Sequence, residues 1–152
     1  MKVWLNASTP RRKIDRSALR RSGTLILNAL GFLDQELSIT LTTDDQIAEL
    51  AGRFGRPRRP TDVLAFSLLD GEDVAFRGRC LGDVVVSLET AGRQAEQRGV
   101  ALETELRDLL IHGVLHLVGM DHGTPAQARG MRALEDHLRW ELLRAEAGHS
   151  GH

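Results

Sequence analysis

The feature that most restricts the fold of this chain is an apolar stretch, Leu109–Met120, which contains two histidines, His112 and His116. A membrane-spanning helix needs about 20 mainly apolar residues, and this stretch is shorter. A helix that is apolar on nearly all sides is instead typical of the interior of a folded domain. We therefore predict a buried helix over 102–118, and the two imidazoles on it need polar partners.

The spacing of three histidines predicts a metal site. His112 and His116 are four residues apart, which places both rings on one face of a helix. His122 could not join them if the helix simply continued. Gly119 stands where the chain must turn, because a glycine just past a helix readily adopts the left-handed conformation. We predict that this turn folds His122 back toward the other two rings.

Three histidines leave a coordination position open for water, which is the arrangement of a catalytic rather than a structural ion. A bound divalent ion would lower the pKa of that water toward about 7 and supply a nucleophile. Neutral imidazole suits Zn²⁺, although nickel, copper and iron also accept it. The alternative is that these are ordinary core or surface histidines with satisfied hydrogen bonds.

Two neighbours of the histidines refine the chemistry. Zinc peptidases carry a glutamate directly after the first histidine, and Gly113 occupies that position here, which argues against peptidase activity. The glycine would instead leave room for a bulky substrate beside the metal. Asp121 is the nearest carboxylate and a candidate general base, or a hydrogen-bond partner of a ligand histidine. It could equally be a turn-forming aspartate.

Alternating patterns elsewhere predict an α/β (α+β) fold, a mixed sheet of about four strands covered by about five helices. We expect one domain over 1–147 and a flexible tail over 148–152. The apolar run Val84–Val86 is typical of an interior strand. The other strands are expected at 3–6, 37–42 and 62–67, and the helices at 14–30, from 43 or 44 to about 54, 88–98, 102–118 and 125 to about 147.

The cysteine content and the N-terminal sequence indicate where in the cell the protein acts. The single cysteine, Cys80, cannot form an intramolecular disulfide, so nothing indicates an oxidising environment. The first apolar run ends at Asn6, far short of a signal peptide. We expect a soluble, cytoplasmic protein without a membrane anchor.

The stretch His112–His122 matches the HGxLHLxGxDH signature of the YbeY family, and the chain resembles that family at two further segments. Pro60–Phe66 is similar to its PTDVLSF segment and Leu81–Ser87 to its GDIVIS strand. The resemblance implies a metal-dependent, single-strand-specific endoribonuclease in the cytoplasm. Its substrates would be ribosomal RNA precursors near the 3′ end of the small-subunit RNA, with a further role in ribosome quality control. It also implies a zinc ion on the three histidines.

The chain departs from the family around a basic segment. An arginine usual five residues before the PTDVL proline is Gly55 here, and Arg56 follows it. Either Arg56 takes over that role or this chain handles the phosphate differently. A cation near the metal would stabilise charge that develops on the phosphate. Arg56, Arg58 and Arg59 are the candidates, unless they are simply a solvated basic loop.

RNA also needs contacts outside the reaction centre. Residues 1–60 hold 11 Lys+Arg against 6 Asp+Glu, although the whole chain has a net charge of −1. We predict phosphate contacts from the N-terminal arginines Arg11, Arg12, Arg16 and Arg20. With no tyrosine, two tryptophans and four phenylalanines, recognition should depend on backbone charge more than on base stacking.

Three functions remain in competition. The leading one is hydrolysis of single-stranded RNA by water activated at His112, His116 and His122. The second is a zinc-stabilised assembly factor that binds ribosomal RNA or protein without cutting. The third, a metallopeptidase, is disfavoured by Gly113.

Overall fold

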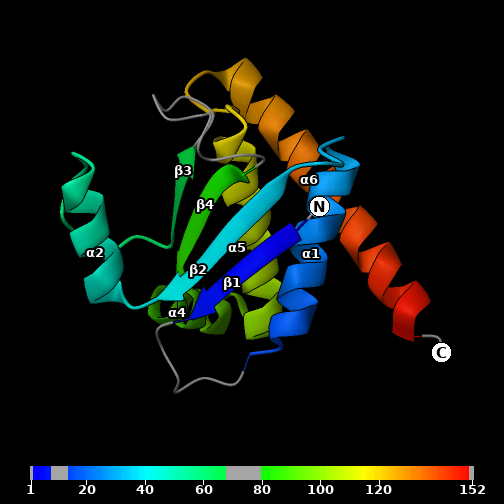
Figure 1. Ribbon diagram of the computed structural model, residues 1–152, viewed down its shortest axis with the longest axis horizontal. Helices are drawn as coiled ribbons and strands as arrows, with labels where there is room; N and C mark the ends of the chain where they lie inside the picture. Colours follow the sequence, from blue (N-terminus) through cyan, green and yellow to red (C-terminus); the bar gives the residue numbers. More distant parts are fainter. Residues whose placement is uncertain (1, 8–13, 68–79, 151–152) are drawn as a thin grey trace.

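The computed structural model of the protein describes residues 2–7, 14–67 and 80–150 (Figure 1). These residues form four strands and five helices, as the sequence predicted. The strands are β1 (Lys2–Ala7), β2 (Glu36–Thr42), β3 (Val63–Ser67) and β4 (Cys80–Ser87). The helices are α1 (Arg16–Ala29), α2 (Asp44–Arg53), α4 (Leu88–Arg98), α5 (Leu102–Leu117) and α6 (Pro125–Ser150).

The four strands form one mixed sheet in the order β1-β2-β4-β3. β2 is parallel to both β1 and β4, whereas β3 is antiparallel to β4. β4 therefore lies inside the sheet, which confirms the prediction for its apolar run. β3 is an edge strand, so its outer side is available to border a site.

Helices cover the two faces of the sheet unequally (Figure 1). α1 and α5 pack against one face, and α6 lies across both of them. The main core forms there and includes Ile39 and Val84 from the sheet and Ile111 and Val114 from α5. α2 covers part of the other face through a smaller cluster made of Ile47, Ala51, Leu64 and Val85.

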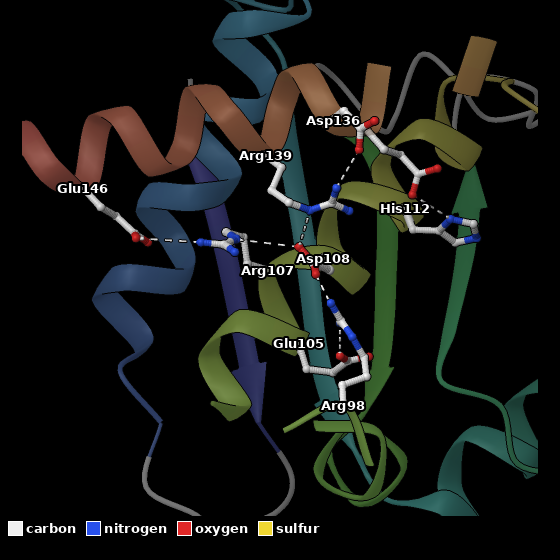
Figure 2. Close-up of polar contacts among 9 residues, drawn as sticks. Arg98, Glu105, Arg107, Asp108, His112, Asp136, Arg139 and Glu146 are labelled. Atoms are coloured by element: carbon white, nitrogen blue, oxygen red, sulfur yellow. Dashed lines mark hydrogen bonds and ion pairs between the residues drawn. The ribbon is translucent and has the colours of Figure 1, made fainter. Parts of the chain in front are cut away.

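An ion-pair network fastens α6 to the central helix α5 (Figure 2). Asp108 of α5 accepts hydrogen bonds from Arg139 of α6 at 3.0 Å and from Arg98 of α4 at 3.2 Å. Arg139 also donates to Asp136 at 2.8 Å. Because Asp108 is largely buried, these charged hydrogen bonds are stronger than their solvent-exposed equivalents. The network sets the position of the neighbouring turns of α6.

The C-terminal helix is longer than the pattern suggested. It was expected to end near Ala147, but α6 continues to Ser150 and includes the start of the segment 148–152. The flexibility of that segment stays a prediction. In the ranges described above, no helix is both long and apolar enough to cross a membrane.

Candidate active site

The structure brings His112, His116 and His122 together, as their spacing predicted. Ligand atoms of the three side chains all lie within 4.8 Å of one another. The Nε2 atoms of His112 and His116 are 3.0 Å apart. The ring of His122 is centred 5.3 Å from that of His116 and 6.1 Å from that of His112. Three imidazoles this close form a potential site for a single ion.

The turn that returns His122 depends on Gly119, which has a φ of +95°. The Gly119 N–H donates to the His116 carbonyl, and the Met120 N–H donates to the Leu115 carbonyl, both at 3.0 Å. This pair of bonds is the Schellman arrangement that closes a helix on a left-handed glycine. It reverses the chain within a few residues and leaves His122 beside the last turn of α5.

The surroundings of His116 favour its neutral imidazole. Burial lowers the pKa of His116, and the adjacent His112 and His122 lower it further because a second positive charge there would be repelled. A neutral ring keeps a lone pair on one nitrogen, which is the form that binds a metal. The donor set therefore fits a divalent transition metal.

A residue that the sequence did not single out completes the surroundings of His112. An oxygen of Glu135 on α6 lies 3.5 Å from Nδ1 of His112, whereas Nε2 of the same ring faces His116. From the sequence, only Asp121 was a candidate for a carboxylate that contacts one of the ligand histidines. Glu135 is one of several acids along α6, so only the docking of α6 on α5 distinguishes it.

A cavity of about 360 Å³ opens beside the first two histidines. Its lining includes Arg56, Thr61 and Asp62 from the segment before β3, and Val63 and Ala65 from β3 itself. Arg56 donates to the Ala65 carbonyl at 3.4 Å and so lies along the outer edge of β3. The structure thus places the predicted arginine beside His112 and His116. Arg58 and Arg59 are exposed on the same segment and do not line the cavity.

Asp121 lies in the turn that carries His122. Its Oδ1 accepts a hydrogen bond from the His122 backbone N–H at 2.7 Å, so the carboxylate stabilises this turn. The side chain is exposed and does not line the cavity. This contact matches the turn-forming interpretation and leaves the second oxygen open to solvent.

Gly113 lines the cavity, in agreement with the room for substrate suggested by sequence, and the structure adds a packing reason for glycine at this position. A Cβ there would lie 2.6 Å from Cγ1 of Val84 and 3.1 Å from Cγ2 of Val63. The missing side chain therefore points into the sheet, and it is the close contact of α5 with β3 and β4 that requires glycine. A glutamate at this position would collide with the same two valines, so the zinc-peptidase arrangement does not fit this fold.

Of the predicted N-terminal RNA contacts, the two that the structure describes, Arg16 and Arg20, do not line the cavity. Arg11 and Arg12 are outside the described residues. Arg16 and Arg20 are exposed on α1, which packs near β1. Since β1 and β3 form opposite edges of the sheet, the structure does not bring these arginines to the histidines.

Comparison with known proteins adds to this geometry. The family model described as endoribonuclease YbeY matches residues 6–142. A relative from Geobacter metallireducens, described as endoribonuclease YbeY, is 40% identical over 140 residues, which cover 91% of this chain and 93% of the relative. A relative of the same description from Aquifex aeolicus is 39% identical over 137 residues, 89% of either chain.

One solved structure shares the fold. The solution structure of TM1509 from Thermotoga maritima superposes with a TM-score of 0.66 and covers 97% of this chain and 93% of its own. Its sequence identity is 24%, so this similarity concerns the arrangement of helices and strands alone.

Proposed function

This chain belongs to the YbeY family of endoribonucleases, and from that premise we propose that it cuts single-stranded ribosomal RNA precursors by metal-dependent hydrolysis. The cut lies near the 3′ end of the small-subunit RNA, and the same activity serves ribosome quality control. The ribosome and its precursors are then the partners, and the cytoplasm is the place of action. The observation that carries the chemistry is the three-histidine cluster beside a cavity lined by an arginine.

His112, His116 and His122 would hold the metal, with zinc as the proposed ion because three imidazoles and an open position suit it. A bound divalent ion supplies Lewis acidity and lowers the pKa of water in the site. Glu135 would accept the Nδ1 proton of His112, which leaves Nε2 unprotonated and directed toward His116. Glu135 is thus a positioning residue for the first ligand.

Arg56 would contact the scissile phosphate. Its guanidinium group lines the cavity next to His112 and His116, and the Ala65 carbonyl and the Phe66 ring hold it in place. A preorganised cation stabilises negative charge as it grows on the non-bridging oxygens during attack. In this proposal Arg56 replaces the family arginine that is absent at Gly55.

Asp121 is the proposed general base. One of its oxygens is occupied by the His122 N–H, and the other is free to accept a proton from an attacking water. Arg58 and Arg59, on the same exposed segment as Arg56, would hold phosphates on either side of the cut. The arginines Arg11, Arg12, Arg16 and Arg20 are proposed to contact more distant parts of the RNA.

The test compares a ligand variant with a matched control. His116→Ala removes one ligand, whereas His137→Ala removes an exposed α6 histidine that lies outside the cluster. We expect His116→Ala and chelator-treated wild type to lose cleavage of a single-stranded RNA, and His137→Ala to keep it. Metal content is measured on the same preparations. A folded His116→Ala protein that cleaves at the wild-type rate would refute the proposal.

The same chelation experiment addresses the non-catalytic alternative. A structural ion contributes folding free energy directly, so its removal would unfold the chain. Here the main core is built from buried aliphatic side chains of the sheet and of α1, α5 and α6, while His122 is exposed. We therefore expect the circular dichroism of the chelated protein to remain that of a folded chain although cleavage stops.

A further inference from the structure

An exposed aromatic ring lies two residues before Arg56, which lines the cavity. Phe54 directly follows α2 and has 60% of its surface exposed, which is high for a large apolar side chain. Its ring centroid lies 4.5 Å from that of Phe66, with the two planes inclined by 39°. Phe66 is itself packed against the small cluster beneath α2, so it anchors the outer ring. We call Phe54 and Phe66 together the aromatic platform.

The platform is continuous with the proposed site through Arg56. The guanidinium carbon of Arg56 lies 5.3 Å from the Phe66 centroid, within cation–π range. The same side chain lines the cavity with His112 and His116. If Arg56 contacts the phosphate of one nucleotide, the base of the adjacent nucleotide would therefore lie within reach of the platform.

The charge around the platform fits a polyanion. The exposed segment 52–60 carries four arginines, and the sequence has no acidic residue between Glu49 and Asp62. Arg53 forms an ion pair with Glu49, whereas Arg56, Arg58 and Arg59 form none with the described residues. An acidic peptide or an anionic membrane would use the charges but has no need of a flat ring beside them. Phosphates together with planar bases use both.

We propose that the aromatic platform is a stacking subsite for one base of the single-stranded RNA, next to the nucleotide whose phosphate Arg56 contacts. This inference rests on the proposed function and deepens it. Stacking on an aromatic ring tolerates any base, because every base has a π-face. The subsite therefore selects unpaired nucleotides over duplex, in which the bases are already stacked, without reading the sequence. The small number of aromatic residues had suggested little stacking, but one well-placed ring is sufficient for such a subsite.

Three variants separate stacking from packing. Phe54→Leu keeps an apolar side chain but removes the ring, and Phe54→Trp enlarges the ring. Trp140→Leu is the control, since Trp140 is 54% exposed on α6 and contacts His137 and Arg144 rather than the platform. Each metal-loaded protein is assayed with a labelled single-stranded decanucleotide for KM and kcat, and the Kd is measured by fluorescence anisotropy with chelator present. The assays are repeated with oligonucleotides that carry one abasic site at each position in turn.

We expect Phe54→Leu to raise KM and Kd about 5- to 150-fold, the equivalent of about 1–3 kcal/mol for one stacked base, with kcat little changed. Phe54→Trp and Trp140→Leu should stay within about twofold of wild type. In the abasic series, one abasic position near the cut should weaken binding of the oligonucleotide to wild type. The same abasic position should not weaken binding to Phe54→Leu any further. That coupling is the signature of a base on the ring.

Two outcomes would overturn the inference. One is a Phe54→Leu protein with KM and Kd within about twofold of wild type. The other is an equal loss in Phe54→Leu and Phe54→Trp with unchanged dependence on abasic sites, because the ring would then serve the fold. Cleavage by both proteins with equal KM and Kd would reject only the platform, whereas absence of cleavage by metal-loaded wild type would reject the proposed function.

Discussion

Replacing Gly113 by alanine tests the close contact between the helix that carries two of the histidines and the sheet. The new Cβ would lie 2.6 Å from Cγ1 of Val84, which is fully buried and β-branched and so cannot easily move aside. Overpacking of this kind costs about 1–3 kcal/mol. Alanine also recovers about 0.5–1 kcal/mol of helix propensity over glycine. The net expectation is a loss of stability of about 0–2.5 kcal/mol.

Gly130 provides the matched control. It also lies within a helix, α6, but a Cβ there would meet nothing within 4 Å. Gly130→Ala should therefore be stabilised by about 0.5–1 kcal/mol, since only the propensity term applies. The two variants should differ by about 1–3 kcal/mol, which is the packing cost alone.

Urea unfolding followed by circular dichroism measures both free energies. For a chain of this size, 1 kcal/mol corresponds to about 2–4 °C in Tm, so thermal melts provide a second reading. The reasoning is refuted if Gly113→Ala is as stable as Gly130→Ala. Such a result would mean that α5 can move away from β3 and β4 without cost.

Two further predictions concern other contacts. Glu135→Gln should weaken metal binding by about 10–100-fold, because His112 loses the acceptor that orients it, and competition with a chromogenic chelator measures this affinity. Glu141→Gln, elsewhere on α6, should bind the metal like wild type. Equal metal affinities for both variants would refute the role of Glu135. Burial tends to raise the pKa of Asp44, but hydrogen bonds from Ser87, Thr90 and Arg93 outweigh it and lower that pKa overall. Because the pKa of Asp44 is lower in the folded state, its carboxylate stabilises the fold at pH values above the unfolded-state pKa near 3.8. This stabilisation is lost as the pH falls through the folded-state pKa. Asp44→Asn should thus flatten the acid side of the stability profile measured by urea unfolding, and an unchanged slope below pH 4 would contradict it.

Local patterns were sufficient to predict the helices and strands. The bounds expected for α4 agree with the structure at both ends, because Ser87 caps its start and Gly99, with a φ of +67°, ends it. Thr43 caps α2 in the same way. Such signals act within a few residues, so a single sequence contains them. The end of α6 was missed, since Gly148 follows Ala147 and glycine commonly marks a helix end, whereas α6 continues through it to Ser150.

The grouping of the three histidines was also predictable, because all of it depends on one helix and one glycine turn. His112 and His116 share a helix face, and Gly119 returns His122 through two backbone hydrogen bonds. The placement of Arg56 was anticipated only as a candidate. Its side chain reaches the histidines because β3 is the edge strand that borders α5, and strand order does not follow from local pattern.

The sequence by itself determined where the helices and strands lie and which three side chains form the ion site, since those features depend on contacts between residues close together in the chain. Only the tertiary structure decided that Glu135 faces His112, that Gly113 is needed against Val84, and that Phe54 packs on Phe66. These contacts join separate elements of the fold. Their existence depends on how α6, β4 and α2 pack, and packing is set by the whole core rather than by any one segment.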